Sequence, residues 1–234
     1  MGRNVESWLL SRRSSKISPA ATRPAVVEAV EPRRLLSGTV HYTTKFADGN
    51  FAPANWKIIP VTVGSGGAQT AARAVKGGHP GAYRIVYNTV YTATGGVGSV
   101  MYGFNEYKKG SYNPAKKGAI TSINYSEDSL LISGFGQGQA TGAAVIQNGV
   151  VYFDTGLVTP NRSWTHQAQK SITAANFTAS DLKSHPDFSQ TGAPMTFGFY
   201  RANSAGSQYT IVAAIDNFSL TIKSAKTIPK PTKK

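Results

Sequence analysis

The feature that most constrains this chain is a regular alternation of short β-prone runs with turn signals, which begins at Gly38. Runs rich in Val, Ile, Thr, Tyr and Phe are separated by Gly, Pro, Asn and Asp, a pattern typical of an all-β sandwich. The chain shows no alternation of strands with helices, which disfavours a parallel-sheet nucleotide fold. The predicted fold is a two-sheet antiparallel jelly-roll sandwich. We expect its strands to include residues 39–46, 55–63, 82–91, 99–104, 119–125, 129–135, 163–172 and 195–200.

Three local patterns make this prediction more specific. Asn148-Gly149 is a type I′ turn dipeptide between two β-prone arms, and it predicts a hairpin. Pro60 indicates an edge strand or a bulge, because proline cannot donate a hydrogen bond to a β-ladder. In residues 210–222, "TIVAAIDNFSLTI", the apolar residues change parity at Asp216-Asn217, which predicts a β-bulge at this point.

Composition divides the 234 residues into three parts. Residues 1–37 lack packing periodicity and are predicted to be a disordered segment, residues 38–222 form the sandwich, and residues 223–234 form a lysine-rich tail. The formal net charge is +14, but it is concentrated at the ends: residues 1–37 hold seven Lys/Arg against three acids, and residues 223–234 hold five Lys and no acid. Basic tails of this kind solubilise a chain or hold polyanions without specificity, so no specific nucleic-acid partner is expected.

Residue counts exclude several classes of site. The chain has no cysteine, which rules out disulfides, thiolate catalysis and Cys-based zinc sites. No apolar run approaches the roughly 18 residues that a membrane-spanning helix needs. The four histidines have no metal-site spacing to one another, and the glycine-rich pieces match neither the P-loop nor the dinucleotide fingerprint.

The segment "VEAVEPRRLLSG" (residues 27–38) resembles the LEPR-x-LL motif found near the N-termini of many planctomycete surface and exported proteins. Val30 stands where that motif usually has leucine, and the matching residues are Glu31, Pro32, Arg33, Leu35 and Leu36. The resemblance implies a sorting or export role for residues 1–37. It also implies that the protein is exported, either to the cell surface or to the extracellular space.

A second resemblance covers most of residues 45–222. Segments such as "FADGNFAPANWKII", "GGHPGAYRIVY", "HPDFSQTGAPMTFGFYRANS" and "AIDNFSLTI" are together similar to bacterial concanavalin-A-like jelly-roll domains of the lectin and glucanase type. The resemblance implies a lectin-like sandwich and, by analogy of fold, carbohydrate binding. The expected function is a non-catalytic exported or cell-surface module that binds carbohydrate or adheres to a matrix.

The candidate carbohydrate-binding residues are Tyr107, Tyr112, Lys108 and Lys109, which we expect in a loop within residues 102–118. Exposed tyrosines could stack on a sugar ring, and the lysines would attract an acidic polysaccharide or cell-surface glycan. The alternative is a basic hairpin tip whose tyrosines fold back on the sheet. Trp56 and Trp164 are expected in the core.

The acid in the predicted bulge needs a partner, because an unpaired buried charge is costly. If the first and last strands lie together, Asp48 comes near Asp216, and both could bind calcium with Asn217. The alternative is a carboxylate that accepts hydrogen bonds from backbone amides in the bulge. Calcium is thus the one cofactor that the sequence suggests.

Catalysis has little support in the sequence. A polysaccharide-cleaving enzyme needs two carboxylates about 5–9.5 Å apart across the scissile bond. Glu127 and Asp128 are adjacent, so in a strand their side chains would point to opposite faces, and a turn is the simpler interpretation. We therefore expect no enzyme. The two alternatives to a binding module are a structural envelope or scaffold sandwich without a small ligand, and a polysaccharide-cleaving enzyme.

Overall fold

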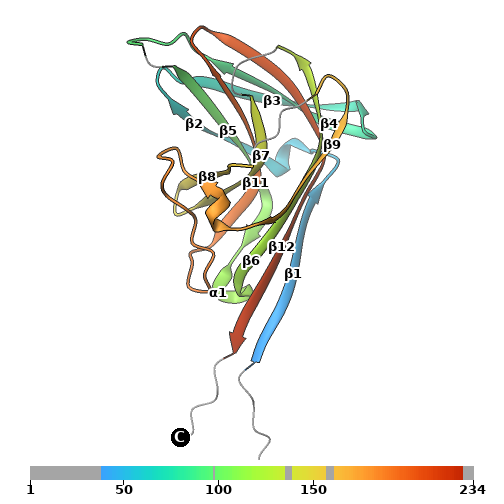
Figure 1. Ribbon diagram of the computed structural model, residues 1–234. Helices are drawn as coiled ribbons and strands as arrows, with labels where there is room; N and C mark the ends of the chain where they lie inside the picture. The colour runs from blue at the N-terminus through green and yellow to red at the C-terminus, as the bar shows by residue number, and fades with distance from the viewer. Residues whose placement is uncertain (1–37, 97, 135–138, 157–160, 229–234) are drawn as a thin grey trace, which may run out of the picture. The chain divides into compact units, whose positions relative to one another are not determined.

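The structure is a computed structural model that describes residues 38–96, 98–134, 139–156 and 161–228 (Figure 1). These residues contain twelve strands in two six-stranded sheets, and all the strand pairs are antiparallel. Sheet A contains β1 (Gly38–Asp48), β3 (Gly67–Gly78), β4 (Gly81–Val90), β6 (Ala119–Ser133), β9 (Thr165–Ile172) and β12 (Tyr209–Ile228). Sheet B contains β2 (Trp56–Val63), β5 (Ser99–Tyr112), β7 (Ala140–Gln147), β8 (Val150–Asp154), β10 (Phe177–Thr178) and β11 (Met195–Ala205).

The strand orders confirm the predicted all-β sandwich of jelly-roll type. Sheet A runs β3-β4-β12-β6-β9, with β1 paired to β12, and sheet B runs β10-β8-β7-β11-β5-β2. The helical elements in the described part of the chain are the short α1 (Pro114–Lys117) and two 3₁₀ turns, η1 (Pro53–Asn55) and η2 (Ala174–Asn176). None of these helices is long and apolar enough to cross a membrane.

Two of the local predictions hold in detail. Asn148 and Gly149 join β7 to β8, with φ angles of 51° and 79°, as a type I′ turn requires. Pro60 lies in β2, which is the last strand of sheet B and pairs only with β5, an edge position at which sheets tolerate proline.

The long strand β12 changes partner at the predicted bulge. Its first half pairs with β4 and its second half with β1, and its register against β6 shifts between Asp216 and Ser219. Asn217 has a φ of 50°, a left-handed conformation that asparagine tolerates better than most residues. Because of this shift, the two sets of apolar residues of opposite parity both point into the core, namely Ile211, Ala213 and Ile215 before it and Phe218, Leu220 and Ile222 after it.

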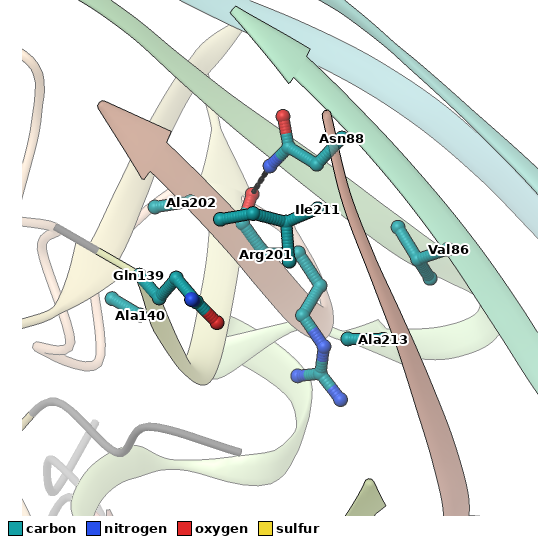
Figure 2. A pocket seen from close by; sticks show the side chains of 8 residues that line it. All are labelled: Val86, Asn88, Gln139, Ala140, Arg201, Ala202, Ile211 and Ala213. Atoms are coloured by element: carbon teal, nitrogen blue, oxygen red, sulfur yellow. Dashed lines mark hydrogen bonds between the residues drawn. The ribbon is translucent and has the colours of Figure 1, made fainter. Parts of the chain in front are cut away.

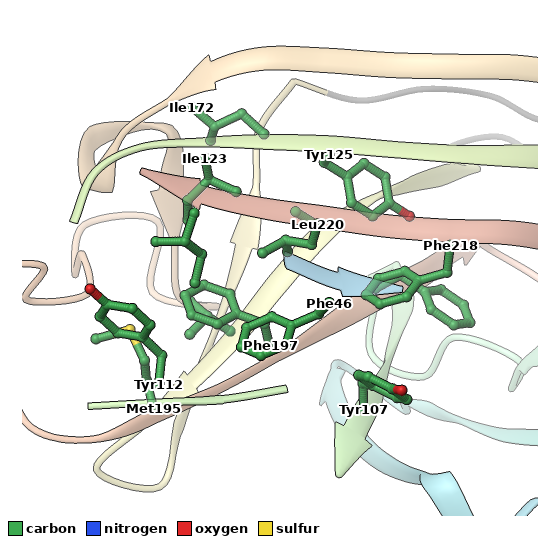
Figure 3. Packing of buried hydrophobic residues seen from close by; sticks show 14 of the residues in the cluster. Phe46, Tyr107, Tyr112, Ile123, Tyr125, Ile172, Met195, Phe197, Phe218 and Leu220 are labelled. Atoms are coloured by element: carbon green, nitrogen blue, oxygen red, sulfur yellow. The ribbon is translucent and has the colours of Figure 1, made fainter. Parts of the chain in front are cut away.

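The main core lies between the two sheets (Figure 3). Its aromatic centre is Trp56, whose ring centroid is 5.2 Å from that of Phe218 and 5.3 Å from that of Phe199. Figure 3 shows the cluster continuing from Phe218 to Tyr112 and Met195 at its far end. Burying this many large side chains stabilises the sandwich without disulfides, at about 1.5–3 kcal/mol for each large apolar side chain.

The structure corrects two expected boundaries. Strand β12 continues to Ile228 beside β1, as Figure 1 shows, so residues 223–228 belong to the sandwich and not to the tail. The alternation of exposed and buried residues that is typical of a strand continues here, because Lys223 points outward while Ser224 is buried. Glu127 and Asp128 do not form a turn either. They lie inside β6, which joins two runs that we expected to be separate strands.

Candidate functional site

The predicted aromatic platform is not formed, because Tyr107 and Tyr112 are both buried in the core, with 7% and 1% of their surface exposed. The hydroxyl of Tyr107 donates to the carbonyl of Ala47 at 3.3 Å, and that of Tyr112 to the carbonyl of Gly118 at 2.9 Å. Burial raises the pKa of both phenols. The expectation of a loop was wrong, since β5 continues to Tyr112.

An irregularity in β5 explains why two tyrosines of opposite parity both face inward. The register of β5 against β11 shifts between Thr196 and Gly198, which lets Tyr112 turn to the same side as Tyr107. The neighbouring Lys108 and Lys109 are exposed. The tyrosines are folded back on the sheet, as in the alternative to a binding loop.

The carboxylates predicted to bind calcium already accept hydrogen bonds from N–H groups. Asp48 accepts from the backbone N–H of Asn50 and of Phe51, both at 2.8 Å, and from the indole N–H of Trp56 at 2.9 Å. Asp216 is fully buried and accepts from the backbone N–H of His79 at 2.6 Å and of Asn217 at 2.7 Å. A calcium ion would have to compete with these donors.

Strand β1 does pair with β12 as expected, with Asp48 opposite Phe218. Burial raises the pKa of Asp216, hydrogen bonds from the backbone amides of His79 and Asn217 lower it, and the net shift is upward. Within the described residues, no group of three or more His, Asp or Glu side chains is arranged to hold a metal ion.

The bulge in β12 holds the turn between β3 and β4. Asp216 accepts from the backbone N–H of His79, and the side-chain amide of Asn217 donates to the carbonyl oxygen of the same residue. The backbone N–H and the backbone carbonyl of His79 are therefore both held by the bulge. This directs the His79 ring towards Asp128 on the outer face of sheet A.

Asp128 is the centre of a cluster on that outer face, which we call the Asp128 cluster and which consists of Tyr83, His79, Asp128, Trp164, His166 and Asn217. Asp128 points outward because its neighbour Glu127 points inward to Arg201 of sheet B. Its carboxylate meets the Nδ1 of His166 at 2.7 Å and the Nδ1 of His79 at 3.1 Å. It also accepts from the side-chain amide of Asn217 at 2.7 Å.

Aromatic rings complete the Asp128 cluster. The rings of His79 and Trp164 are nearly parallel, at 8°, with centroids 6.3 Å apart, and Tyr83 meets Trp164 edge-on at 5.5 Å. The indole N–H of Trp164 donates to the carbonyl of Gly77 at 3.2 Å. Trp164 was expected in the core together with Trp56. It instead lies partly exposed on the surface.

The electrostatics of the cluster are set by Asp128. Burial raises the pKa of its carboxyl, hydrogen bonds from Asn217, His166 and His79 lower it, and the net shift is downward. Asp128 is therefore ionised at neutral pH. Because a carboxylate can only accept, both imidazoles must donate from Nδ1.

A second candidate lies on the outer face of sheet B. A groove of about 160 Å³, which we call the outer groove, runs between three aromatic rings and the segment 178–182. Its lining residues are Tyr102, Phe153, Asp154, Thr155, Thr178, Ala179, Ser180, Leu182 and Tyr200. The ring of Phe153 is stacked on that of Tyr102 at 4.7 Å and meets that of Tyr200 at 5.2 Å.

Gly142 makes the floor of the outer groove possible. A Cβ atom at this position of β7 would lie 3.1 Å from the ring of Tyr200, so the glycine lets Tyr200 lie across the sheet. The Tyr200 hydroxyl reaches the carbonyl of Asp154 on β8 and donates to it at 2.8 Å. The result is an apolar aromatic floor beside hydroxyl groups from Thr155, Thr178 and Ser180.

Asp154 is the only acid among the residues that line the outer groove. It is 2% exposed, and the backbone N–H of Gly156 donates to one of its oxygens at 3.0 Å. Burial raises the pKa of Asp154, while the Gly156 amide and the side chain of Gln169 lower it in part. Its other oxygen has no hydrogen-bond partner within the described chain.

The cavity between the two sheets, as lined by the described residues, is much smaller than the outer groove. Figure 2 shows the cavity there, where the side chain of Asn88 on β4 donates to the carbonyl of Arg201 on β11 at 2.9 Å. Its volume is about 10 Å³, the size of one water molecule. The surrounding polar side chains hold the two sheets together and could not admit a saccharide.

The residues of the N-terminal sorting motif, Glu31 to Leu36, lie outside the described part of the chain. The motif and the surface localisation that it implies remain predictions.

Comparisons with known proteins give a likeness of fold. No family model matches the chain, and no curated protein matches it. Among solved structures, it is similar to a family 11 carbohydrate-binding module from Clostridium thermocellum in complex with a β-1,3-1,4-mixed-linked tetrasaccharide, with 14% identity and a TM-score of 0.47. It is also similar to the family 11 module of a cellulosomal cellulase of Clostridium thermocellum, with 14% identity and a TM-score of 0.46. Each comparison covers 76% of this chain and 94% of the other. At this level of likeness, function has to be argued from the residues themselves.

Proposed function

We propose that this protein is a non-catalytic, exported or cell-surface module that binds polysaccharide in the outer groove. The observation that carries the proposal is the groove itself, which sets an aromatic floor beside hydroxyl groups on the outer face of sheet B. Aromatic rings have a negative face that attracts the C–H groups of a sugar ring. Nearby hydroxyl groups can then exchange hydrogen bonds with the sugar.

The size and charge of the groove favour part of a long, uncharged chain as ligand. Its volume of about 160 Å³ is below the range of pockets that enclose a whole small molecule, which begins at about 300 Å³. Its lining contains no lysine or arginine to attract an anion. The lysines that suggested an acidic glycan, Lys108 and Lys109, are not among the lining residues.

The two alternative functions make different demands. A scaffold sandwich without a ligand would have inward-facing tyrosines, as Tyr107 and Tyr112 are, but it would need no aromatic strip on an outer sheet face. A polysaccharide-cleaving enzyme would need two carboxylates facing an open groove, and the lining of the outer groove supplies Asp154 alone. Asp216 is fully buried under the β3–β4 turn, so it does not provide the second.

Calorimetric titration of the full chain tests the proposal, with cellotetraose and mannotetraose as neutral probes and tetragalacturonate as the acidic one. We expect a neutral probe to bind and Tyr102→Ala to weaken it at least tenfold, since Tyr102 supplies the accessible ring of the floor. Tyr42→Ala is the matched control, because Tyr42 is 41% exposed on β1, outside the groove. No binding of any probe, or equal binding by Tyr102→Ala, would refute the groove as a saccharide site.

A further inference from the structure

We infer that the Asp128 cluster is a second binding site, which takes an uncharged saccharide on the outer face of sheet A. It would make the protein bivalent, because the outer groove lies on the outer face of the opposite sheet. The class of ligand rests on the proposed function. The location of the second site rests on the geometry of the Asp128 cluster itself.

The cluster is preorganised, because its side chains come from four separate strands or turns and are held by one another. His79 comes from the turn after β3, Asp128 from β6, His166 from β9 and Asn217 from the bulge in β12. Trp164 lies just before β9, and its indole N–H donates to the carbonyl of Gly77, which fixes the ring. A ligand that binds here does not have to order these side chains, which lowers the cost of binding.

The polar groups of the cluster are fixed in orientation and open to solvent. The imidazoles of His79 and His166 are 57% and 64% exposed, although each Nδ1 is occupied by Asp128. With the proton on Nδ1, a neutral imidazole carries a lone pair on Nε2 and can accept a hydrogen bond. Two such acceptors beside an aromatic ring suit the hydroxyl groups of a sugar, which can donate to them while the ring stacks.

The charges of the cluster argue against a polyanion. Asp128 and Asp216, which are 5% and 0% exposed, lie side by side on one face in the pairing of β6 with β12. The partners of the two carboxylates within the described residues are imidazoles, backbone amides and the amide of Asn217, with no lysine or arginine among them. These two carboxylates place negative charge within the cluster, which disfavours the phosphates of a nucleic acid.

Amide NMR of the full chain, titrated with cellotetraose, mannotetraose and tetragalacturonate, tests this inference. We expect a neutral probe to shift the amide signals of residues 77–83 and 164–166, separately from those of the outer groove. Trp164→Ala should weaken binding at the cluster about tenfold, the loss expected for one aromatic contact. Trp164→Phe should retain part of the affinity. The imidazole of His166 is 64% exposed, and His166→Ala should weaken binding several-fold by removing one acceptor.

The variants separate the two sites. Tyr102→Ala should remove the shifts of the outer groove and leave those of the cluster, and Tyr87→Ala, an exposed ring elsewhere on β4, should change neither. Shifts in the groove alone would overturn the second site and leave the proposed function standing. Shifts in the cluster that survive Trp164→Ala, or that only tetragalacturonate produces, would also overturn it. If no probe shifts either region, both proposals fail.

Discussion

The buried ion pair between Glu127 and Arg201 gives the sharpest prediction about stability. Their side chains are 0% and 4% exposed, and the carboxylate lies 3.1 Å from the guanidinium. The carboxylate also accepts from the hydroxyls of Tyr125 and Thr141. Burial raises the pKa of Glu127, and the Arg201 charge and these hydrogen bonds only partly offset it. Each charge is thus tolerated in the interior because the other is present.

The expected loss in the free energy of unfolding depends on which of the two charges remains buried without its partner. Glu127→Leu leaves a buried guanidinium that cannot lose its proton, which costs about 3–5 kcal/mol of unfolding free energy. Arg201→Met leaves a buried carboxyl that can take up a proton. The loss of unfolding free energy in this variant should therefore be smaller at acid pH than at neutral pH. The double variant removes both charges and should cost less than the sum of the single changes, by at least about 2 kcal/mol.

Urea denaturation, followed by circular dichroism, measures these costs. With a slope of roughly 2 kcal/mol per molar urea, Glu127→Leu should lower the midpoint by about 2 M. In Arg201→Met the folded pKa of Glu127 should rise further above its unfolded value of about 4.3, so stability should fall as pH rises from that value. A loss below about 1 kcal/mol for Glu127→Leu, or strictly additive effects in the double variant, would refute the reasoning.

Four further predictions concern other parts of the chain. Asn217→Ala should cost about 1–3 kcal/mol, because it removes two side-chain hydrogen bonds and puts alanine at a φ of 50°; a loss for Asn217→Gly as large as that for alanine would contradict the backbone part. The pKa of Asp154 is raised in the folded protein, so losing its proton as pH rises through that pKa lowers the stability of the folded state. Asp154→Asn should therefore become more stable relative to the unchanged protein between pH 4 and pH 8, as measured by urea titration. If the two proteins show the same dependence of stability on pH, this prediction is wrong. Because Asp48 and Asp216 already accept several N–H bonds, the melting temperatures in calcium and in EDTA should agree, and a rise with calcium would instead support the calcium site. Deleting residues 1–37 should leave the melting transition intact and abolish export in a fractionation assay, whereas loss of folding would contradict the sorting interpretation.

Sequence patterns that depend on local backbone chemistry predicted the structure well. The change of parity at Asp216-Asn217 located the bulge, because only a register shift lets residues of both parities face one core. Asn148-Gly149 located a hairpin through its positive φ angles, and Pro60 identified an edge strand through its missing donor.

Predictions that depend on the continuation of a strand were less successful. The expected loop within residues 102–118 does not form around the tyrosines, because β5 runs on to Tyr112 and has an irregularity that buries both of them. Nothing in a single sequence shows such a register shift when polar and small residues surround it.

The candidate sites were hard to predict because each combines distant segments. His79, Asp128, Trp164 and His166 come together only through the pairing of strands in sheet A, and no short motif connects them. One feature of the sequence, a pair of adjacent aromatic residues, is related to the outer groove. Phe199 and Tyr200 are adjacent in β11 and both are fully buried, which indicates that this strand is covered on both faces.

A crystal structure of the full chain soaked with the neutral tetrasaccharide that binds best would test the central claim most directly. We expect sugar density in the outer groove, with one ring against Tyr102 and hydroxyl groups near Thr178 and Ser180. Saturating sugar that occupies another surface and leaves the outer groove empty would contradict the account.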